Sequence, residues 1–232
     1  MSTPSFAPDF DSAAYRDAHS RINAVVVVGE GLADRQFRLL ARSIPEDRDV
    51  LLHLAAMEAR HARDFVGCGR HLAIRPDLPR ARRLFAPLAD LFRACDRAGD
   101  LPACLVIQGL VVECFAVAAY DAYLPVADAY ARSITAAVLA DEAEHLAYAE
   151  RWLGTRFAVV QDAVQEACRR ALPITLAMLR SLTEDLRSIG MDPEALLAGF
   201  ALRFQRALEA IGFDPPVARR LIVAAALASV PG

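Results

Sequence analysis

With 232 residues, of which 55% are hydrophobic, the chain has enough apolar side chains to bury a large core. Its formal net charge of −3 argues against a nucleic-acid-binding surface, which would need an excess of positive charge to neutralise phosphates. All 26 basic residues are arginine, and the absence of lysine excludes any mechanism in which a lysine forms a Schiff base with a carbonyl substrate.

Helical periodicity dominates the sequence, and no segment alternates apolar and polar residues over the length of a strand. We therefore expect an all-α protein in which residues 1–232 form one domain. The expected long helices, in chain order, cover residues 12–41, 45–70, 80–98, 101–123 and 125–153. Shorter helices are expected in the remainder, with interruptions at Pro173, Gly190, Pro193, Gly212 and Pro215-Pro216.

The segment from Leu101 to Tyr120 is long and apolar enough to span a bilayer, and Glu113 is its one charged residue. Pro102, Gln108 and the central glutamate make insertion into a membrane costly. No basic residue anchors either end. We therefore expect a buried central helix of the protein and no transmembrane span.

The cysteines and the first residues indicate a cytoplasmic location. The five cysteines are odd in number and show no CxxC spacing, which favours reduced thiols in the core over disulfides or a zinc site. Met1 to Pro4 do not begin a signal peptide, since no basic region is followed by an apolar stretch.

Two parts of the chain repeat one arrangement, in which a glutamate is followed about one helical hairpin later by a Glu-x-x-His motif. The six residues, in chain order, are Glu30, Glu58, His61, Glu113, Glu142 and His145. Residues three positions apart share a face of an α-helix, so the glutamate and the histidine of each motif can bind one ion. This set of side chains from four helices is typical of ferritin-like di-iron or di-manganese sites.

The faces on which these glutamates lie strengthen the case for metal ions. Each glutamate belongs to an apolar stripe that should face the core, where an unpaired carboxylate is costly. Four converging carboxylates would repel one another unless cations held them together, and two divalent ions balance four negative charges. Donors that are mostly oxygen favour iron or manganese over zinc.

Other polar residues near the motifs are expected to lie outside the site. A single Glu-x-x-His motif occurs by chance in many helices, so the repetition is what favours a metal. Asp141 and Glu144 are expected to be solvated or to contact a ligand from outside. His19, His53 and His71 have no glutamate at helical spacing and are not expected to bind metal.

Residues 107–120, IQGLVVECFAVAAY, and shorter segments resemble the aldehyde-deformylating oxygenases, also called long-chain fatty aldehyde decarbonylases. The shorter segments are residues 17–25, 57–61, 68–70, 76–78, 123–128, 172–174 and 211–213. The resemblance implies a ferritin-like helical bundle with additional C-terminal helices and two iron ions held by the six residues. It also implies that Tyr120 hydrogen-bonds near the ligands. Phe37 and His19 stand where this family often carries tyrosine.

The activity implied by this resemblance is conversion of a long-chain fatty aldehyde into an alkane or alkene one carbon shorter, plus formate. Dioxygen is the implied co-substrate, and electrons are expected from a ferredoxin and its reductase. An acyl-carrier-protein reductase is an expected supplier of the aldehyde. The candidate walls of a substrate tunnel, which ordinary core packing would also explain, are Val26, Val27, Phe65, Gln108, Ala116, Val117 and Tyr120.

Three alternatives remain open from the sequence. A ferritin-like iron-storage or ferroxidase protein would use the same six residues in a shell-forming oligomer. A di-iron oxygenase could act on a different carbon substrate. A purely structural helical bundle would not respond to metal removal.

Overall fold

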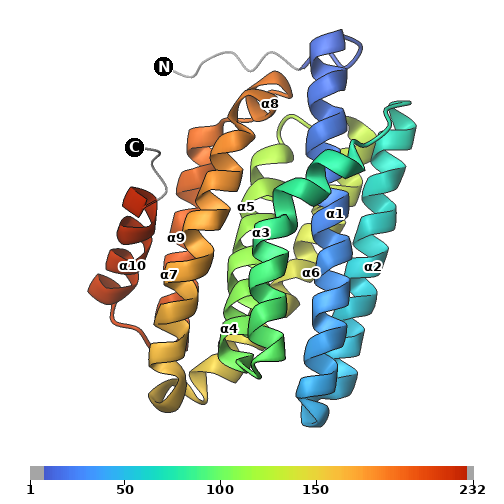
Figure 1. Cartoon of the computed structure of the whole chain (residues 1–232). Coiled ribbons are helices and arrows are strands. Elements are labelled where there is room, and N and C mark those ends of the chain that lie inside the picture. The colour runs from blue at the N-terminus through green and yellow to red at the C-terminus, as the bar shows by residue number, and fades with distance from the viewer. Residues whose placement is uncertain (1–7, 229–232) are drawn as a thin grey trace.

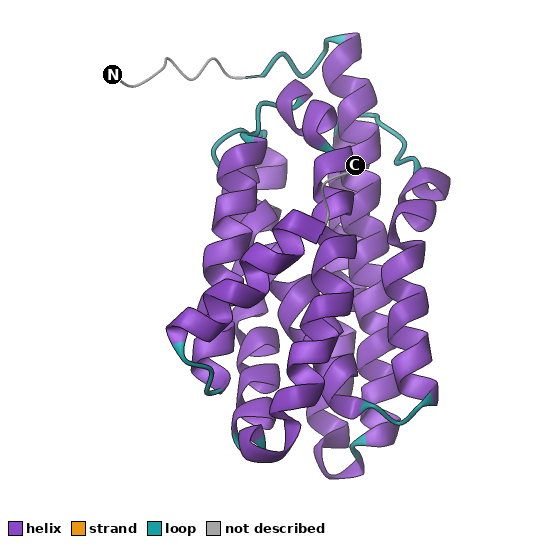
Figure 2. Cartoon of the chain, turned by 60° about the vertical axis from the view of Figure 1, so that its left-hand side comes forward, coloured by secondary structure: helices purple, strands orange, loops and turns teal. Residues whose placement is uncertain are grey.

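The computed structural model describes residues 8–228, and every regular element in that range is helical (Figure 2). The prediction of an all-α protein is confirmed, whereas the N-terminal residues Met1 to Pro4 lie outside the described part. The elements in chain order are α1 (Ala13–Ser43), η1 (Pro45–Asp47), α2 (Arg48–His71), α3 (Leu78–Arg97), α4 (Leu101–Leu105), η2 (Val106–Val112), α5 (Glu113–Tyr123), α6 (Ala129–Gly154), α7 (Phe157–Ser181), α8 (Thr183–Ser188), α9 (Pro193–Ile211) and α10 (Pro215–Ala228).

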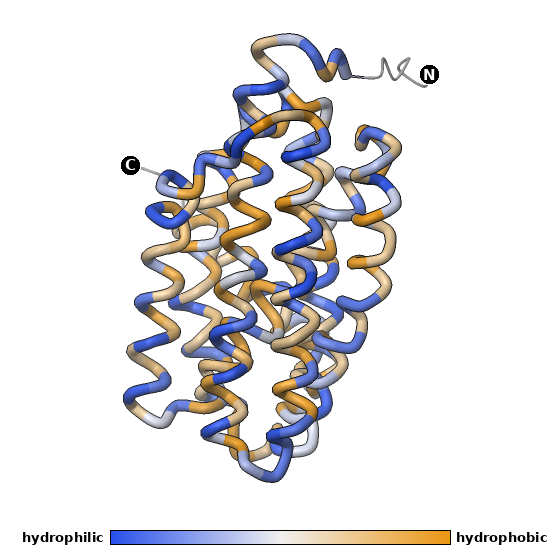
Figure 3. Tube along the Cα trace, turned by 90° about the vertical axis from the view of Figure 1, so that its right-hand side faces the viewer, coloured by the Kyte–Doolittle hydropathy of each residue, from blue (hydrophilic) through white to orange (hydrophobic). Residues whose placement is uncertain are grey.

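The long helices stand side by side as a bundle (Figure 1). Helix α1 packs along α2, and α5 packs against α6 and α9. Helices α7, α9 and α10 cover the side of the bundle away from α1 and α2, which confirms additional C-terminal helices around a ferritin-like core. Hydrophobic and hydrophilic residues follow one another in turn along the helices (Figure 3). This pattern gives a helix an apolar face that packs against the core.

The apolar segment predicted as a central helix is a continuous helical run made of α4, η2 and α5. It extends from Leu101 to Tyr123, and its most apolar window of 18 residues has a mean hydropathy of 2.0 and is 72% buried inside the protein. By length and composition it is the one candidate membrane span among the described residues, and its burial confirms the prediction of a core helix. Its middle part, η2, is a π-helix, which the sequence analysis did not predict.

Close packing around the π-helix depends on a glycine. A Cβ atom added to Gly109 would overlap the Cβ of Ala149 on α6, so glycine lets the two backbones approach. Glu113 is the first residue of α5, immediately after this π-helix. π-Helical turns are frequent at functional sites, and here the turn precedes one of the six candidate residues directly.

Two predicted helix boundaries were wrong. Helix α6 begins at Ala129 and not at Pro125, because the Asp128 side chain accepts hydrogen bonds from the backbone N–H groups of Tyr130 and Ala131 and caps the helix there. Pro173 does not interrupt the chain but lies inside α7. Buried residues on both sides of Pro173 hold α7 against its neighbours, so packing offsets the backbone hydrogen bond that proline cannot make.

The short helix α8 is tied to the rest of the bundle by one buried carboxylate. Arg21 of α1 donates hydrogen bonds to both oxygens of Asp185, at 2.7 to 2.9 Å, and Arg80 of α3 approaches the same carboxylate at 3.4 Å. Asp185 is 7% exposed. The ion pairs of Asp185 with these two arginines therefore join α8 to α1 and α3 at the end of the bundle where α1 begins (Figure 1).

Replacing Asp185 with Ala is expected to lower the free energy of unfolding by about 1–2 kcal/mol, because both arginines lose their acceptor in a largely buried place. Urea denaturation followed by circular dichroism measures the change. Glu184→Ala is the matched control: its ion pair with Arg187 is exposed, so the expected change is within about 0.5 kcal/mol. Equal effects of the two substitutions would contradict an anchoring role for Asp185.

Candidate metal centre

Four helices bring the six candidate residues together at the centre of the bundle. Glu30 comes from α1, Glu58 and His61 from α2, Glu113 from α5, and Glu142 and His145 from α6. All six are buried, with exposed fractions between 0% and 5%. The prediction that these side chains turn inward and converge is therefore confirmed.

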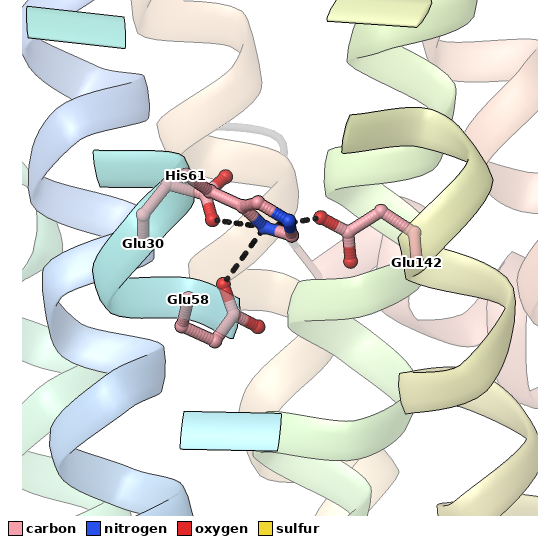
Figure 4. Close-up of side chains that lie close together, drawn as sticks. All are labelled: Glu30, Glu58, His61 and Glu142. Atoms are coloured by element: carbon pink, nitrogen blue, oxygen red, sulfur yellow. Dashed lines mark ion pairs between the residues drawn. The ribbon is translucent and has the colours of Figure 1, made fainter. Parts of the chain in front are cut away.

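The first group of side chains surrounds His61. Its Nδ1 atom lies 3.3 Å from Glu30 Oε2, 3.5 Å from Glu142 Oε1 and 3.7 Å from Glu58 Oε2 (Figure 4). The other ring nitrogen, Nε2, lies 3.1 Å from Asp141 Oδ2. Asp141 thus orients the His61 ring from outside the group, so that Nδ1 is directed at three carboxylates.

The second group surrounds His145 in the same way. Its Nδ1 atom lies 2.9 Å from Glu58 Oε1, 3.1 Å from Glu142 Oε2 and 3.5 Å from Glu113 Oε2. The Nε2 atom is buried without a hydrogen-bond partner and belongs to a ring whose neighbour is Phe37, at 5.6 Å between ring centres. Packing, not a second hydrogen bond, therefore orients this histidine.

Both groups can hold a metal ion. In each, one donor atom per residue lies within 4.8 Å of all the others, and Glu58 and Glu142 belong to both groups. Glu30 Oε2, Glu142 Oε1 and His61 Nδ1 are buried without a hydrogen-bond partner, as expected for atoms that face a ligand. Two shared glutamates, each with two oxygens, suit a pair of ions bridged by carboxylates.

The electrostatics show why cations fit here. Burial and neighbouring carboxylates raise the pKa values of Glu30, Glu58 and Glu142 well above that of an ordinary glutamate. Burial also opposes ionisation of Glu113, but hydrogen bonding to His145 and the charge of His145 outweigh burial and lower the pKa of this glutamate. The pKa of His145 is raised because hydrogen bonds to carboxylates outweigh its burial. Without metal, the cluster therefore holds protons where divalent ions would supply positive charge.

Side chains outside the six hold two of the glutamates in place. Tyr120 donates a hydrogen bond to Glu30 Oε1, and Gln108 Nε2 donates one to Glu113 Oε1 at 2.7 Å. The contact implied for Tyr120 by the family resemblance is therefore present. Gln108, predicted as a tunnel wall, instead orients a glutamate.

Arg60 is a residue of this site that the sequence analysis missed. Its guanidinium group donates a hydrogen bond of 2.5 Å to Asp141 Oδ2, the same atom that contacts His61 Nε2. Arg60 lies inside the Glu58-to-His61 motif and Asp141 lies next to Glu142, so adjacency to the motifs was the available signal. Glu144, His53 and His71 are exposed and belong to neither group, as predicted.

A largely apolar cavity, with about 950 Å³ of empty space when the open solvent at its mouth is included, adjoins the cluster. Glu30, Glu58, Glu113 and Glu142 form part of its wall, and its other lining residues are mostly apolar. Of the predicted tunnel residues, the cavity is lined by Val26, Phe65, Ala116 and Tyr120. Val27 and Val117 are half-buried and do not line it, because their side chains point to other faces of α1 and α5.

We expect the melting temperature of the metal-free chain to fall as the pH rises from about 5, just above the ordinary glutamate pKa. A carboxyl group whose pKa is raised in the folded state contributes stability that is fully present below its unfolded pKa. This contribution is lost as the pH rises and the group ionises in the folded state, which applies to Glu30, Glu58 and Glu142. The pKa of His145 is also raised, so its contribution is lost in the same direction. Differential scanning fluorimetry in EDTA measures the effect.

Two comparisons sharpen this test. Adding manganese(II) or iron(II) should raise the melting temperature, and more so at high pH, because the ions bind the ionised carboxylates. Glu142→Gln, which cannot ionise, should reduce the pH-dependent fall of the metal-free chain. A metal-free melting temperature that climbs with pH would refute the assigned direction.

Two comparisons with known proteins agree with this geometry. Residues 12–228 match the family model described as long-chain fatty aldehyde decarbonylase. A solved structure from Synechococcus, named as protein 19 with aldehyde deformylating oxidase activity, is 61% identical in sequence and superposes with a TM-score of 0.92. That match covers 93% of this chain and 99% of the other. The chain therefore belongs to the long-chain fatty aldehyde decarbonylase family.

Proposed function

We propose that this protein is a di-iron oxygenase that converts a long-chain fatty aldehyde into an alkane or alkene one carbon shorter, plus formate. The observation that carries the proposal is that the apolar cavity ends on the buried Glu/His cluster, whose four glutamates form part of its wall. Family membership and the activity named for the Synechococcus relative support the same reaction.

The balanced reaction defines what must be supplied. An aldehyde RCHO, one dioxygen, four electrons and four protons give RH, formic acid and one water. Two iron ions, when bound by the six residues, would supply the redox chemistry with dioxygen and polarise the aldehyde carbonyl. The fit of four glutamates and two histidines to two divalent ions supports this choice of cofactor.

The chain's own residues bind the alkyl part and exclude water from the reacting end. Each methylene moved from water into the apolar cavity contributes about 0.8 kcal/mol, so a long chain gains affinity with length. Tyr120 lines the cavity, stacks on Phe65 at 5.2 Å between ring centres and holds Glu30. These contacts fix one glutamate at the boundary between the apolar cavity and the metal centre.

The apolar wall also separates this proposal from iron storage. An iron-storage protein must conduct hydrated ions to its cluster, and such a path needs polar side chains along its length. The cavity that reaches this cluster is lined instead by residues such as Val26, Phe85, Leu179 and Leu196. A path of this kind suits a fatty chain better than a hydrated ion.

The proposal extends to the electron source, the aldehyde source and the location. We expect a ferredoxin and its reductase to supply the electrons, an acyl-carrier-protein reductase to supply the aldehyde, and the protein to act in the cytoplasm. The five cysteines are all buried free thiols, which suits a reducing compartment.

The first test is a Glu113→Ala variant assayed with a long-chain aldehyde, dioxygen and a ferredoxin reducing system. Loss of one carboxylate should lower the iron bound per chain and abolish both alkane, measured in the headspace, and formate. Glu144→Ala is the matched control because Glu144 is exposed and lies next to His145 on the same helix. Full iron content and full activity in Glu113→Ala would contradict the assignment of Glu113 to the metal site.

A second test concerns chain length. Ala116→Phe should fill part of the cavity and reduce kcat/KM for the longest aldehydes about tenfold relative to shorter ones, the effect of excluding about two methylenes. Val117→Phe places the same phenylalanine side chain one position along, where it does not line the cavity. An identical length profile in both variants would show that Ala116 does not border the bound chain.

A further inference from the structure

Buried polar atoms without a hydrogen-bond partner gather at two places along the same cavity. One place is the metal centre. At the other lie the buried Tyr15 hydroxyl, His19 Nδ1, the Tyr123 hydroxyl and Asp128 Oδ2. His19 Nδ1 and Asp128 Oδ2 have no such partner in the described structure, and the two tyrosine hydroxyls have none beyond each other. We call these four residues the polar end. Unsatisfied polar groups are few in native proteins, so this group indicates a ligand or bound water that completes it.

The members of the polar end lie close together although they come from three regions of the chain. The rings of Tyr15 and His19 stack at 5.6 Å between centres. The Tyr15 and Tyr123 hydroxyls are near enough to hydrogen-bond to each other, and Asp128 lies near enough to act on the pKa values of both tyrosines and of His19. Asp128 uses Oδ1 to cap α6, which leaves Oδ2 for this cluster.

The polar end and the metal centre lie at opposite ends of one cavity. His19 and Tyr123 line that cavity, as do Glu30 and Glu113. His19 precedes Glu30 by eleven residues on α1, and a helical rise of 1.5 Å per residue separates them by about 16 Å along the axis. Tyr123 follows Glu113 by ten residues on α5, which gives about 15 Å.

The wall between the two ends is apolar apart from Cys68 and Asn23, and the Asn23 amide donates a hydrogen bond to the backbone carbonyl of Phe65. Ile22 and Val26 of α1, Ala119 of α5, and Leu182 and Met191 beside α8 line this stretch. A ligand that satisfies both ends therefore has a polar group at each end and an apolar chain between them. An unsubstituted alkyl chain of full length would place a methyl group against the polar end and leave its atoms unpaired.

Burial opposes charge on His19 and on Tyr15 of the polar end. Burial lowers the pKa of His19 to about 4, even though Asp128 favours the charged imidazole. Burial also raises the pKa of Tyr15 to about 12, which opposes the phenolate. A neutral group that both donates and accepts hydrogen bonds suits this place, since the Tyr123 hydroxyl can donate, Nδ1 of a neutral His19 can accept, and both residues line the cavity.

We propose that the polar end is a binding subsite for a neutral hydroxyl group at the far end of the bound chain, so that the protein takes ω-hydroxy fatty aldehydes as well as unsubstituted ones. This substrate class rests on the proposed function, because the aldehyde group is assigned to the metal centre. The subsite itself is a matter of binding and can be tested without turnover.

The experiment is isothermal titration calorimetry on the full chain without reductant, comparing 1-alkanols with 1,ω-diols over a series of chain lengths. At the length that reaches both ends, the diol should bind about tenfold more tightly than the alkanol, the effect of one well-satisfied buried hydroxyl. Shorter diols should show no advantage, because they cannot reach the polar end.

Variants locate the effect. His19→Phe and Tyr123→Phe should each bring the ratio of diol affinity to alkanol affinity toward one. Tyr123→Phe is the milder change, because it removes only the hydroxyl group. Tyr148→Phe is the matched control, because it removes a tyrosine hydroxyl that bonds to Asp47 and does not line the cavity. Retained alkanol binding and an unchanged circular dichroism spectrum show that a variant is folded.

Three outcomes overturn the proposal. They are equal affinity of diol and alkanol at every length, an advantage that survives both cavity substitutions, and equally tight binding of the matching ω-hydroxy and ω-carboxy alcohols. Failure of the proposed function has a different signature, since the unsubstituted aldehyde would then yield no alkane even while the diol keeps its advantage.

Discussion

Four carboxylates enclosed in an apolar core form the constraint on which this structure depends. Each is at most 5% exposed, and no arginine contacts any of them in the described hydrogen bonds and ion pairs. An isolated buried carboxylate that stays ionised costs too much free energy, so each of the four must be protonated, paired with a histidine or bound to a metal ion. The bundle keeps them together because the helices that carry them are held elsewhere by extensive apolar packing.

The helices are built to hold these groups at fixed positions. Ser12 caps the start of α1 and Asp128 the start of α6, so that each helix begins at a defined residue ahead of its glutamate. The contact between Gly109 and Ala149 brings η2 close to α6, just before Glu113. Tyr120, Gln108 and the Arg60–Asp141 pair then orient individual side chains of the cluster. Rigid helices and outer hydrogen bonds together offset the repulsion that would separate the carboxylates.

The sequence was sufficient to predict what depends on helical spacing. Glu58 and His61, like Glu142 and His145, share a face whatever else the chain does, and apolar neighbours show that this face turns inward. Spacing could not distinguish the wall of a cavity from ordinary core, and for this reason Val26 and Ala116 were predicted together with Val27 and Val117. The π-helix, the continuity of α7 through Pro173 and the cluster around His19 arise from tertiary packing, which leaves no local pattern.

Helix α8 is held both by apolar packing and by ion pairs. A helix of six residues cannot be stable alone and ordinarily depends on burying its apolar face. Here Leu182, Leu186 and Ile189, in and beside α8, are buried in the core and also form part of the cavity wall. The ion pairs of Asp185 add to this apolar packing. The two ends of the cavity are therefore fixed by different polar contacts, the carboxylate and histidine cluster at one end and the arginine contacts of Asp185 on α8, while apolar residues line the stretch between them.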